Sequence, residues 1–273
     1  MNPTQRFVTA PDGVRLAVYE AGPADGAPIV FIHGFGQSGL SWLRQFESPL
    51  ADSFRLVAFD LRGHAASDKP LDKAVYQSGA TWADDLAAVI GSLEGGKKVV
   101  LVPWSFGGGV VGEYLAKHGA GRVAAINFCA ASTRMAPEWI GPGRFNVKDT
   151  MSEDPQVNIP GVKAFIRGCF EVEPSAADLE FMLGFNMMMP PRVRAMVSGR
   201  PFDFEQALRA LAVPVLVTHG TADRMVLPAM GEHTASVVPG AKMSVYEGIG
   251  HCPFWEDAAR FNAELGALVR SVT

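Results

Sequence analysis

Ser105, Asp223 and His251 are the residue types that nucleophilic catalysis requires, and they are spread widely along the chain. A serine hydroxyl is a poor nucleophile near neutral pH, so it needs a base, and one ring nitrogen of His251 can accept its proton. Asp223 can hold the other ring nitrogen and stabilise the imidazolium. The order serine, aspartate, histidine is typical of folds in which a strand-to-helix turn presents the serine. The sequence therefore predicts acyl transfer at Ser105.

The residues around Ser105 predict such a turn. An apolar run at Val99–Val102 is typical of a strand, and the segment from Phe106 to His118, which contains three consecutive glycines, is typical of a helix. The usual glycine-x-serine-x-glycine pattern is broken because Pro103 stands in the first glycine position. Proline fits there only if the turn uses neither a backbone N–H nor a positive φ at that residue.

Phe35 and Phe106 stand where backbone N–H groups could hold a developing oxyanion. Phe106 directly follows the serine at a helix start, and Phe35 lies in the segment His33–Gly36 after an early strand. We expect these two amides to form the oxyanion hole. Phe35 and Trp104 are also expected to bind substrate as an aromatic wall, with core packing beside the turn as the alternative for Trp104.

Other polar residues are expected to have structural roles. Asp203 and Glu247 compete with Asp223 for the acidic position, but Asp203 precedes a predicted helix as a cap, and the chain order favours Asp223. His33 is expected to make structural hydrogen bonds rather than act as a second base. Asp60–His64 is interpreted as a turn that supports the active-site edge.

No metal or cofactor is expected, because His118, His219 and His233 lack metal-like spacing with acidic neighbours. Cys129, Cys169 and Cys252 are odd in number and form no C-x-x-C pair, so we expect reduced, mainly structural thiols.

Composition excludes several partners. The chain has 273 residues, is 48% hydrophobic and 19% charged, and carries a formal charge of −4. This composition predicts a large buried core and offers no basic stripe for nucleic acid or an anionic membrane. The N-terminus lacks the pattern of a signal peptide and no segment approaches ~18 uninterrupted apolar residues, so a cytoplasmic location is expected.

Strand-like and helix-like patterns alternate along the chain. Helices are predicted at Phe106–His118 and at Thr81–Leu93, the second opened by a cap of Thr81 with Asp84. Such alternation predicts an α/β fold with a mostly parallel sheet covered by helices on both faces. The predicted strands are Val14–Tyr19, Ile29–Ile32, Arg55–Phe59, Val99–Val102, Val123–Cys129, Pro214–Thr218 and Met243–Tyr246.

About 80 residues with proline-interrupted helical pieces separate two of these strands. We interpret residues 132–206 as a helical cap, and residues 1–131 with 207–273 as the core domain. The cap holds seven of the eleven methionines, which suits a lid over an apolar cavity, although its apolar residues could equally form a small core of its own. Met187, Met188 and Met189 cannot all face one cavity from a helix. Its aromatic residues are Trp139, Phe145, Phe165, Phe170, Phe181 and Phe185.

Taken together, these motifs resemble the α/β-hydrolase superfamily over essentially the whole chain. The nearest resemblance is to the bacterial cofactor-free haloperoxidase, perhydrolase and arylesterase group. Two departures from the pattern are Pro103 and Gly36, the latter standing where many haloperoxidase-like members have proline. The motifs are His33–Gly36, Asp60–His64, Thr81–Leu86, Trp104–Gly109 with Tyr114–Gly119, His219–Asp223 and Gly250–His251.

The resemblance implies an eight-stranded sheet with a helical cap, no cofactor, and hydrolysis of a small apolar carboxylic ester or lactone through an acyl-enzyme. One alternative is a cofactor-free perhydrolase or haloperoxidase that uses the same triad. Another is a hydrolase-fold ligand receptor with vestigial catalysis. Homo-oligomerisation is compatible with the sequence.

Overall fold

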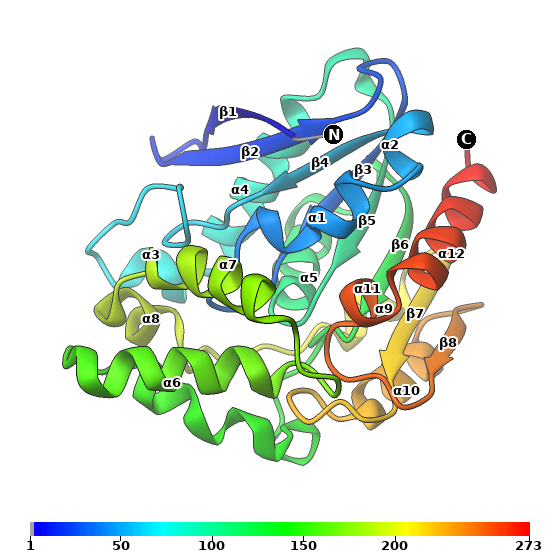
Figure 1. Ribbon diagram of the computed structural model, residues 1–273. Coiled ribbons are helices and arrows are strands. Elements are labelled where there is room, and N and C mark those ends of the chain that lie inside the picture. The colour runs from blue at the N-terminus through cyan, green and yellow to red at the C-terminus, as the bar shows by residue number, and fades with distance from the viewer. Residues whose placement is uncertain (1–2) are drawn as a thin grey trace.

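One sheet of eight strands forms the centre of the molecule, in the order β1-β2-β4-β3-β5-β6-β7-β8 (Figure 1). The structure is a computed structural model that describes residues 3–273, except for the side chains of residues 144–146, so Phe145 of the predicted cap lies outside the described side chains. β3 to β8 are parallel, whereas β2 is antiparallel to β1 and β4. The strands are β1 (Thr4–Thr9), β2 (Arg15–Ala21), β3 (Ala27–Ile32), β4 (Phe54–Phe59), β5 (Val99–Pro103), β6 (Val123–Cys129), β7 (Val215–Gly220) and β8 (Lys242–Tyr246).

The predicted α/β class with an eight-stranded, mostly parallel sheet is confirmed. Each of the seven predicted strand ranges overlaps an observed strand, with ends that differ by no more than two residues. Only β1 lies outside them. β1 is an edge strand in which only Val8 is buried. A strand with one buried residue needs almost no alternation of apolar and polar residues, so the sequence pattern did not reveal it. The central strands β3 and β5 are buried along nearly their whole length, as expected where helices cover both faces.

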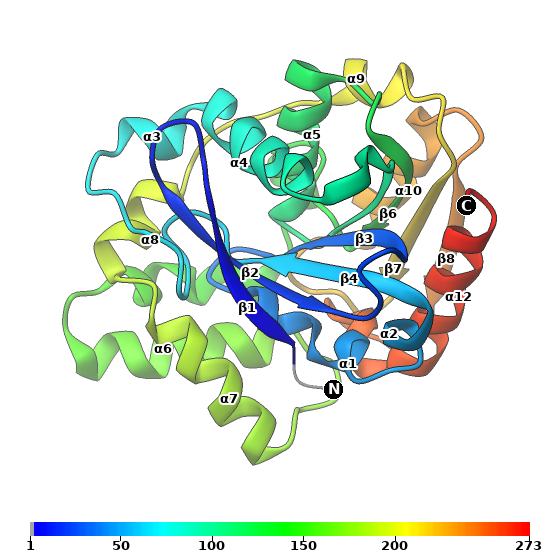
Figure 2. The same cartoon turned by 90° about the horizontal axis from the view of Figure 1, so that it is seen from above.

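Helices lie on both faces of the sheet, and Figure 2 shows the two layers with the strands between them. One layer contains α3 (Ala74–Gln77), α4 (Gly79–Gly91), α5 (Gly107–His118) and α10 (Pro228–Val237). The other contains α1 (Leu43–Phe46), α2 (Leu50–Ser53), α11 (Pro253–Glu256) and α12 (Ala258–Arg270). Two short 3-10 helices complete the connections, η1 (Gly39–Trp42) and η2 (Glu94–Gly96).

The predicted cap of the helix at Thr81 is wrong. The helix α4 begins at Gly79, and its N-cap residue Ser78 makes no side-chain cap hydrogen bond. The carboxylate of Asp84 instead accepts from Lys117 Nζ at 2.7 Å, and its Oδ1 lies 3.0 Å from His118 Nε2. A tertiary contact with α5 has replaced the local bond on which the capping pattern depends.

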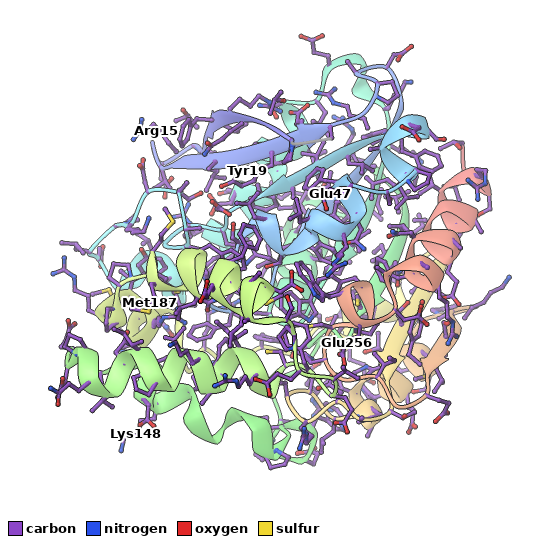
Figure 3. All side chains as sticks on the ribbon, in the orientation of Figure 1. Arg15, Tyr19, Glu47, Lys148, Met187 and Glu256 are labelled. Carbon is purple, nitrogen blue, oxygen red and sulfur yellow. The ribbon has the colours of Figure 1, made fainter. Side chains whose placement is uncertain are left out.

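A helical insertion, which we define as the segment between β6 and β7, lies beside the carboxyl ends of the parallel strands (Figure 1). Its position agrees with the predicted cap, whose boundaries at 132 and 206 stay a prediction. Met187 and Met188 are exposed and Met189 is buried; Figure 3 shows Met187 near the edge of the molecule. The elements are η3 (Pro137–Trp139), η4 (Pro142–Met151), α6 (Pro155–Gly168), α7 (Ala176–Met187), α8 (Pro191–Val197) and α9 (Glu205–Arg209).

Among residues 3–273, no helix is long and apolar enough to cross a bilayer. The three cysteines are unpaired and buried.

The segment Asp60–His64 is a buried polar turn at the end of β4. Asp60 accepts hydrogen bonds from Ser38 Oγ at 2.6 Å, from the Gly39 amide at 2.7 Å and from Tyr19 Oη at 2.9 Å. These bonds tie β2 and the loop after β3 to one carboxylate. The turn is therefore structural, as the sequence indicates.

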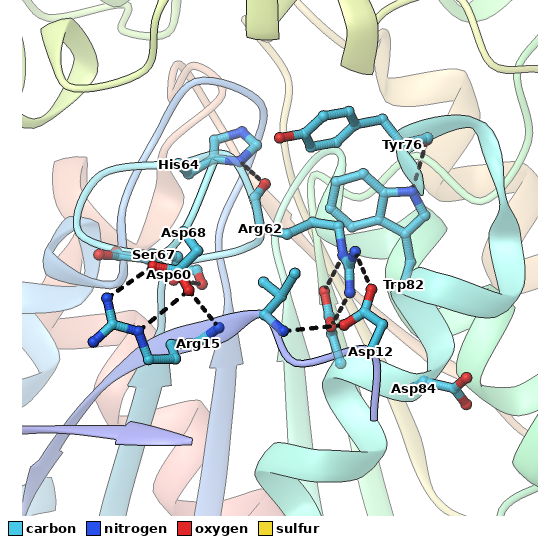
Figure 4. Close-up of polar contacts among 12 residues, drawn as sticks. Asp12, Arg15, Asp60, Arg62, His64, Ser67, Asp68, Tyr76, Trp82 and Asp84 are labelled. Atoms are coloured by element: carbon cyan, nitrogen blue, oxygen red, sulfur yellow. Dashed lines mark hydrogen bonds and ion pairs between the residues drawn. The ribbon is translucent and has the colours of Figure 1, made fainter. Parts of the chain in front are cut away.

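Arg62 is the centre of a second buried contact in this turn (Figure 4). Its Nε and Nη2 each lie 2.6 Å from an oxygen of Asp85, and its Nη1 lies 2.8 Å from Asp12. The side chains of Arg62 and Asp85 are both fully buried. This bidentate pair joins the β4 loop to α4 and keeps both charges hydrogen-bonded away from water.

The imidazole of His33, which directly follows β3, is held between two backbone groups. Its Nε2 accepts from the Leu61 amide at 2.9 Å, so Nδ1 carries the proton and donates to the Gly34 carbonyl at 2.7 Å. Both nitrogens are occupied, which agrees with the structural interpretation. Burial lowers the pKa of His33 from 6.5 to about 4, although Asp60 and the Gly34 carbonyl favour the protonated ring.

The Asp85→Asn substitution is expected to lower the free energy of unfolding by about 3–5 kcal/mol, because it removes the bidentate carboxylate of the buried Arg62 guanidinium and leaves only the partly exposed Asp12 to balance its charge. Urea denaturation measures this loss. Asp68→Asn is the matched control, since Asp68 pairs with Arg15 at the surface, where solvent screens the charges. Equal stability losses in the two variants would contradict the assigned role of the buried pair.

His33 is expected to make the fold sensitive to acid. The unfolded chain binds a proton near pH 6.5 and the folded chain only near pH 4, so stability present above pH 6.5 is lost as the pH falls. His33→Gln keeps an acceptor but does not titrate. From pH 7 to pH 4, wild type should lose about 3 kcal/mol more unfolding free energy than this variant. Urea titrations at both pH values test this; a pH-independent difference would show that His33 is not kept neutral by the fold.

Candidate active site

Ser105 lies on a sharp turn between β5 and α5. Its φ is 53°, a left-handed conformation that is uncommon for a residue with a side chain. The turn is closed by hydrogen bonds from the Gly107 amide to the Trp104 carbonyl at 2.8 Å and from the Gly108 amide to the Ser105 carbonyl at 2.9 Å. The strained strand-to-helix turn expected from the sequence is present at this serine.

Small residues allow α5 to begin close to the sheet. A Cβ at Gly107 would lie 2.6 Å from the Ile32 carbonyl oxygen, and one at Gly108 would lie 2.6 Å from that of Ser132. Backbone atoms cannot move aside cheaply, so these positions exclude larger residues. The helix therefore starts between the ends of β3 and β6, with Ser105 at the same edge.

Pro103 is accommodated because the turn bends two residues later. Pro103 is the last residue of β5, and the left-handed φ belongs to Ser105. The neighbouring bond to β3 comes from the Trp104 amide, which donates to the Ile32 carbonyl at 2.9 Å. A proline can therefore stand at position 103, since no positive φ is required of it.

His251 and Asp223 form a buried pair in the loops after β8 and β7. His251 Nδ1 lies 2.7 Å from Asp223 Oδ2, and each residue is only 2% exposed. The other oxygen, Oδ1, accepts from the amides of Met225 at 2.8 Å and Val226 at 3.0 Å. A carboxylate with this many donors stays ionised and fixes which nitrogen of His251 carries a proton.

The electrostatics of Asp223 agree with this geometry. Burial raises the pKa of Asp223, but the neighbouring His251 and His219 outweigh burial and hold the pKa below its usual range. His219 Nε2 lies 3.1 Å from Asp223 Oδ2. The sequence motifs did not predict a site role for His219, although its place four residues before Asp223 at the end of a strand was a signal for one.

The two rivals of Asp223 lie elsewhere. Asp203 forms an ion pair with Arg134, with Oδ2 2.9 Å from Nε, and its Oδ1 accepts from the Glu205 amide. Glu247 accepts from Thr221 Oγ1. Neither carboxylate has a hydrogen bond to His251 among the described contacts.

The amides of Phe35 and Phe106 are available as donors. Neither has a hydrogen-bond acceptor among residues 3–273, and both residues line the same cavity as Ser105. Phe106 is also the N-cap residue of α5, where the helix presents the positive end of its dipole. These are the properties that an oxyanion site requires, and they belong to the two predicted residues.

The cavity has a volume of about 340 Å³ and brings together Ser105, His251, Phe35, Phe106 and Trp104. Trp104 also packs in the core: it is 3% exposed, and its Nε1 donates to the His251 carbonyl at 2.9 Å. The core packing of Trp104 is therefore observed, and its contact with substrate stays a prediction. The helical insertion supplies most of the remaining wall. Phe165, Met135 and Met151 belong to the aromatic residues and methionines of the predicted cap, and the other lining residues of the insertion are Ser132, Ile140, Val147, Cys169, Val197, Ser198, Gly199, Arg200 and Phe202.

Arg200 is the one permanently charged side chain among the described lining residues. It pairs with Glu113 of α5, so its charge is locally compensated. The described residues contain no group of three or more His, Cys, Asp or Glu side chains that could hold a metal ion.

Comparisons with known proteins identify relatives that match nearly the whole chain. A non-heme chloroperoxidase of Streptomyces lividans is 30% identical over 277 residues, covering 97% of this chain and 99% of that protein. A bifunctional esterase/perhydrolase of Acinetobacter calcoaceticus is 29% identical over 278 residues, covering 97% and 99%. The crystal structure of an esterase from Rhodococcus sp. matches with a TM-score of 0.92 and 35% identity, covering 98% of this chain and 99% of that chain.

A family model described as the alpha/beta hydrolase family matches residues 29–264. That range contains the turn at Ser105, the buried Asp223 and His251 pair, and the whole helical insertion. The chain therefore belongs to the α/β hydrolase family.

Proposed function

We propose that this protein is a serine hydrolase that cleaves a small carboxylic ester or lactone through an acyl-enzyme intermediate. One observation carries the proposal: a serine in a left-handed turn and a histidine bonded to a buried aspartate both line one largely apolar cavity. Hydrolytic chemistry also fits the similarity to the Rhodococcus esterase.

In the first step, Ser105 Oγ attacks the substrate carbonyl carbon and its proton passes to His251 Nε2. The tautomer of His251 supports this direction, because its Nδ1 is already bonded to Asp223 and its Nε2 is left to act as the base. Asp223 remains ionised and stabilises the imidazolium that forms. A carboxylate with a depressed pKa suits this role.

The carbonyl oxygen becomes an oxyanion, and the amides of Phe35 and Phe106 are the proposed donors. Their preorganisation in a largely apolar cavity makes such hydrogen bonds more effective than bonds to solvent. Collapse of the intermediate expels the alcohol, which takes the proton from His251. Water then attacks the acyl-enzyme with His251 again as base, releasing the acid and restoring Ser105.

The cavity wall supports apolar substrates of modest size. Phe35 and Trp104 are proposed to contact the substrate beside the serine, and the described lining residues are mostly apolar. A lactone places its alcohol and acid in one ring, and the same steps open it.

Replacement of Ser105 by alanine tests the nucleophile. We expect Ser105→Ala to reduce kcat for p-nitrophenyl acetate by at least about a thousand-fold, because the acyl-enzyme cannot form. Ser236→Ala, at an exposed position on α10, is the matched control and should retain wild-type turnover. Mass spectrometry after treatment with a fluorophosphonate should locate the label on Ser105 in wild type. Wild-type turnover in Ser105→Ala would refute the assignment.

Perhydrolysis is the second candidate, favoured by similarity to a chloroperoxidase and to an esterase/perhydrolase. Hydrogen peroxide would replace water in the deacylation step, and the peracid formed would oxidise halide. The same serine, histidine and amides would serve both reactions.

A halide assay separates the two reactions. We expect p-nitrophenyl acetate cleavage without bromination of monochlorodimedone in acetate, bromide and peroxide, because Gly36 replaces the proline common in haloperoxidase-like chains. Bromination that disappears in Ser105→Ala would instead establish perhydrolysis at this site. Turnover of many equivalents of ester per protein molecule would contradict a ligand receptor with vestigial catalysis.

A further inference from the structure

His219 makes a contact that the proposed reaction does not yet use. It is the residue before the last in β7, it is 1% exposed, and its Nε2 lies 3.1 Å from Asp223 Oδ2 and 2.9 Å from the Val226 carbonyl oxygen. Both neighbours are hydrogen-bond acceptors. Nε2 must therefore carry a proton and donate it to the two oxygens.

The acceptor is the same carboxylate oxygen that orients His251. Asp223 Oδ2 thus receives N–H groups from two imidazoles, at 2.7 Å from His251 and 3.1 Å from His219. Oδ1 is occupied by two backbone amides. Both oxygens of the carboxylate are consequently fixed in position, and His219 is the only side chain besides His251 that bonds it among the described residues.

Helix α10 packs against the side of the His219 ring that carries Nδ1. A Cβ at Gly231 of α10 would lie 2.5 Å from His219 Nδ1, so the helix backbone packs directly against the imidazole. Nδ1 has no hydrogen-bond partner among the residues that the structure describes. Nε2 is therefore the only ring nitrogen of His219 that bonds its surroundings among the described residues.

We propose that His219 is a positioning residue for acyl transfer: its Nε2–H fixes Asp223 Oδ2 and thereby aims the Nε2 of His251 at Ser105. The proposal rests on the proposed function, since it assigns a role within that triad. His219 does not line the cavity and so acts through Asp223 rather than on the substrate. If His219 only tied β7 to the loop at Val226, its loss would change stability and leave the chemistry unaltered.

Two substitutions separate these roles. His219→Gln can keep an N–H near Asp223, whereas His219→Leu removes it with little change in size. We expect His219→Leu to lower kcat for p-nitrophenyl acetate about 10- to 100-fold, the scale of a hydrogen bond to a charged group, with KM unchanged. The kcat of His219→Gln for the same ester should stay within about three-fold of the wild-type value. Equal kcat in wild type and His219→Leu would overturn the proposal.

The pH profile gives a readout that a packing role would not move. Without the His219 N–H, more of the charge of Asp223 is available to the imidazolium of His251, so the acidic limb of kcat/KM should move to higher pH. The ionisable groups around this carboxylate are His219, His251 and the Cys129 thiol, whose pKa burial raises and the charge of Asp223 raises further. An acidic limb that stays in place in His219→Leu would contradict the proposal.

A spectroscopic test is independent of turnover. In Ser105→Ala protein, proton NMR can follow the hydrogen-bonded Nδ1 proton of His251. Adding His219→Leu should shift or broaden this resonance, and adding His219→Gln should leave it near its original position. This result would stand even if Ser105→Ala proved active, which would refute the proposed function alone. An identical resonance in all three proteins would overturn the positioning role.

Gly231→Ala serves if His219→Leu does not fold. The added methyl group would displace the imidazole while every site residue is kept, so kcat should fall and the His251 resonance should shift. Gly91→Ala is the matched control, because a Cβ at that position in α4 meets no atom within 4 Å. Wild-type kcat and an unshifted resonance in Gly231→Ala would count against the proposal as directly as they would in His219→Leu.

Discussion

The left-handed backbone of Ser105 is the constraint on which the site depends. A φ of 53° at a residue with a side chain costs of the order of 1–3 kcal/mol, so the surrounding structure must hold it. The buried strand β5 on one side and the start of α5 on the other supply that support. Because the turn reverses the chain within a few residues, the hydroxyl, the Phe106 amide and the loop after β3 reach the same edge of the sheet.

The helical insertion takes part in this arrangement as well as covering it. The Ser132 amide donates to the Ser105 carbonyl at 2.9 Å, and the His251 amide donates to the Cys169 carbonyl at 2.9 Å. Glu256, labelled in Figure 3, accepts from the Gly250 amide through Oε1 and from the Glu171 amide through Oε2. The insertion and the loop of His251 are thus tied to each other, so a shift of one would alter both the cavity and the base.

The sequence was most informative where local pattern and chain order carry the information. Apolar runs predicted the central strands because those strands are buried on both faces, and the order of Ser105, Asp223 and His251 predicted a group that the structure brings to one region. Strand β1 was not predicted because its residues are mostly exposed. The predicted helix cap of Thr81 with Asp84 was wrong because the Asp84 carboxylate bonds Lys117 of α5 instead. Contacts between segments that are far apart in the chain, such as those of the insertion with the cavity, leave no periodic pattern, and the spacing of His219 and Asp223 does not by itself show that their side chains bond.

The loop at Gly36 depends on a backbone conformation that few residues adopt. Its φ of 73° is closed to proline, which could stand there only if the loop were rebuilt. The guanidinium of Arg194 occupies the space beside Gly36, donates to the Asn186 carbonyl at 2.5 Å and lies 5.9 Å from the centre of the Phe35 ring. Burial lowers the pKa of Arg194 to about 10, within the range of a cation at neutral pH. The conformation of the Phe35 loop is therefore set jointly by β3 and by an arginine of the insertion, which lies more than 150 residues away in the chain.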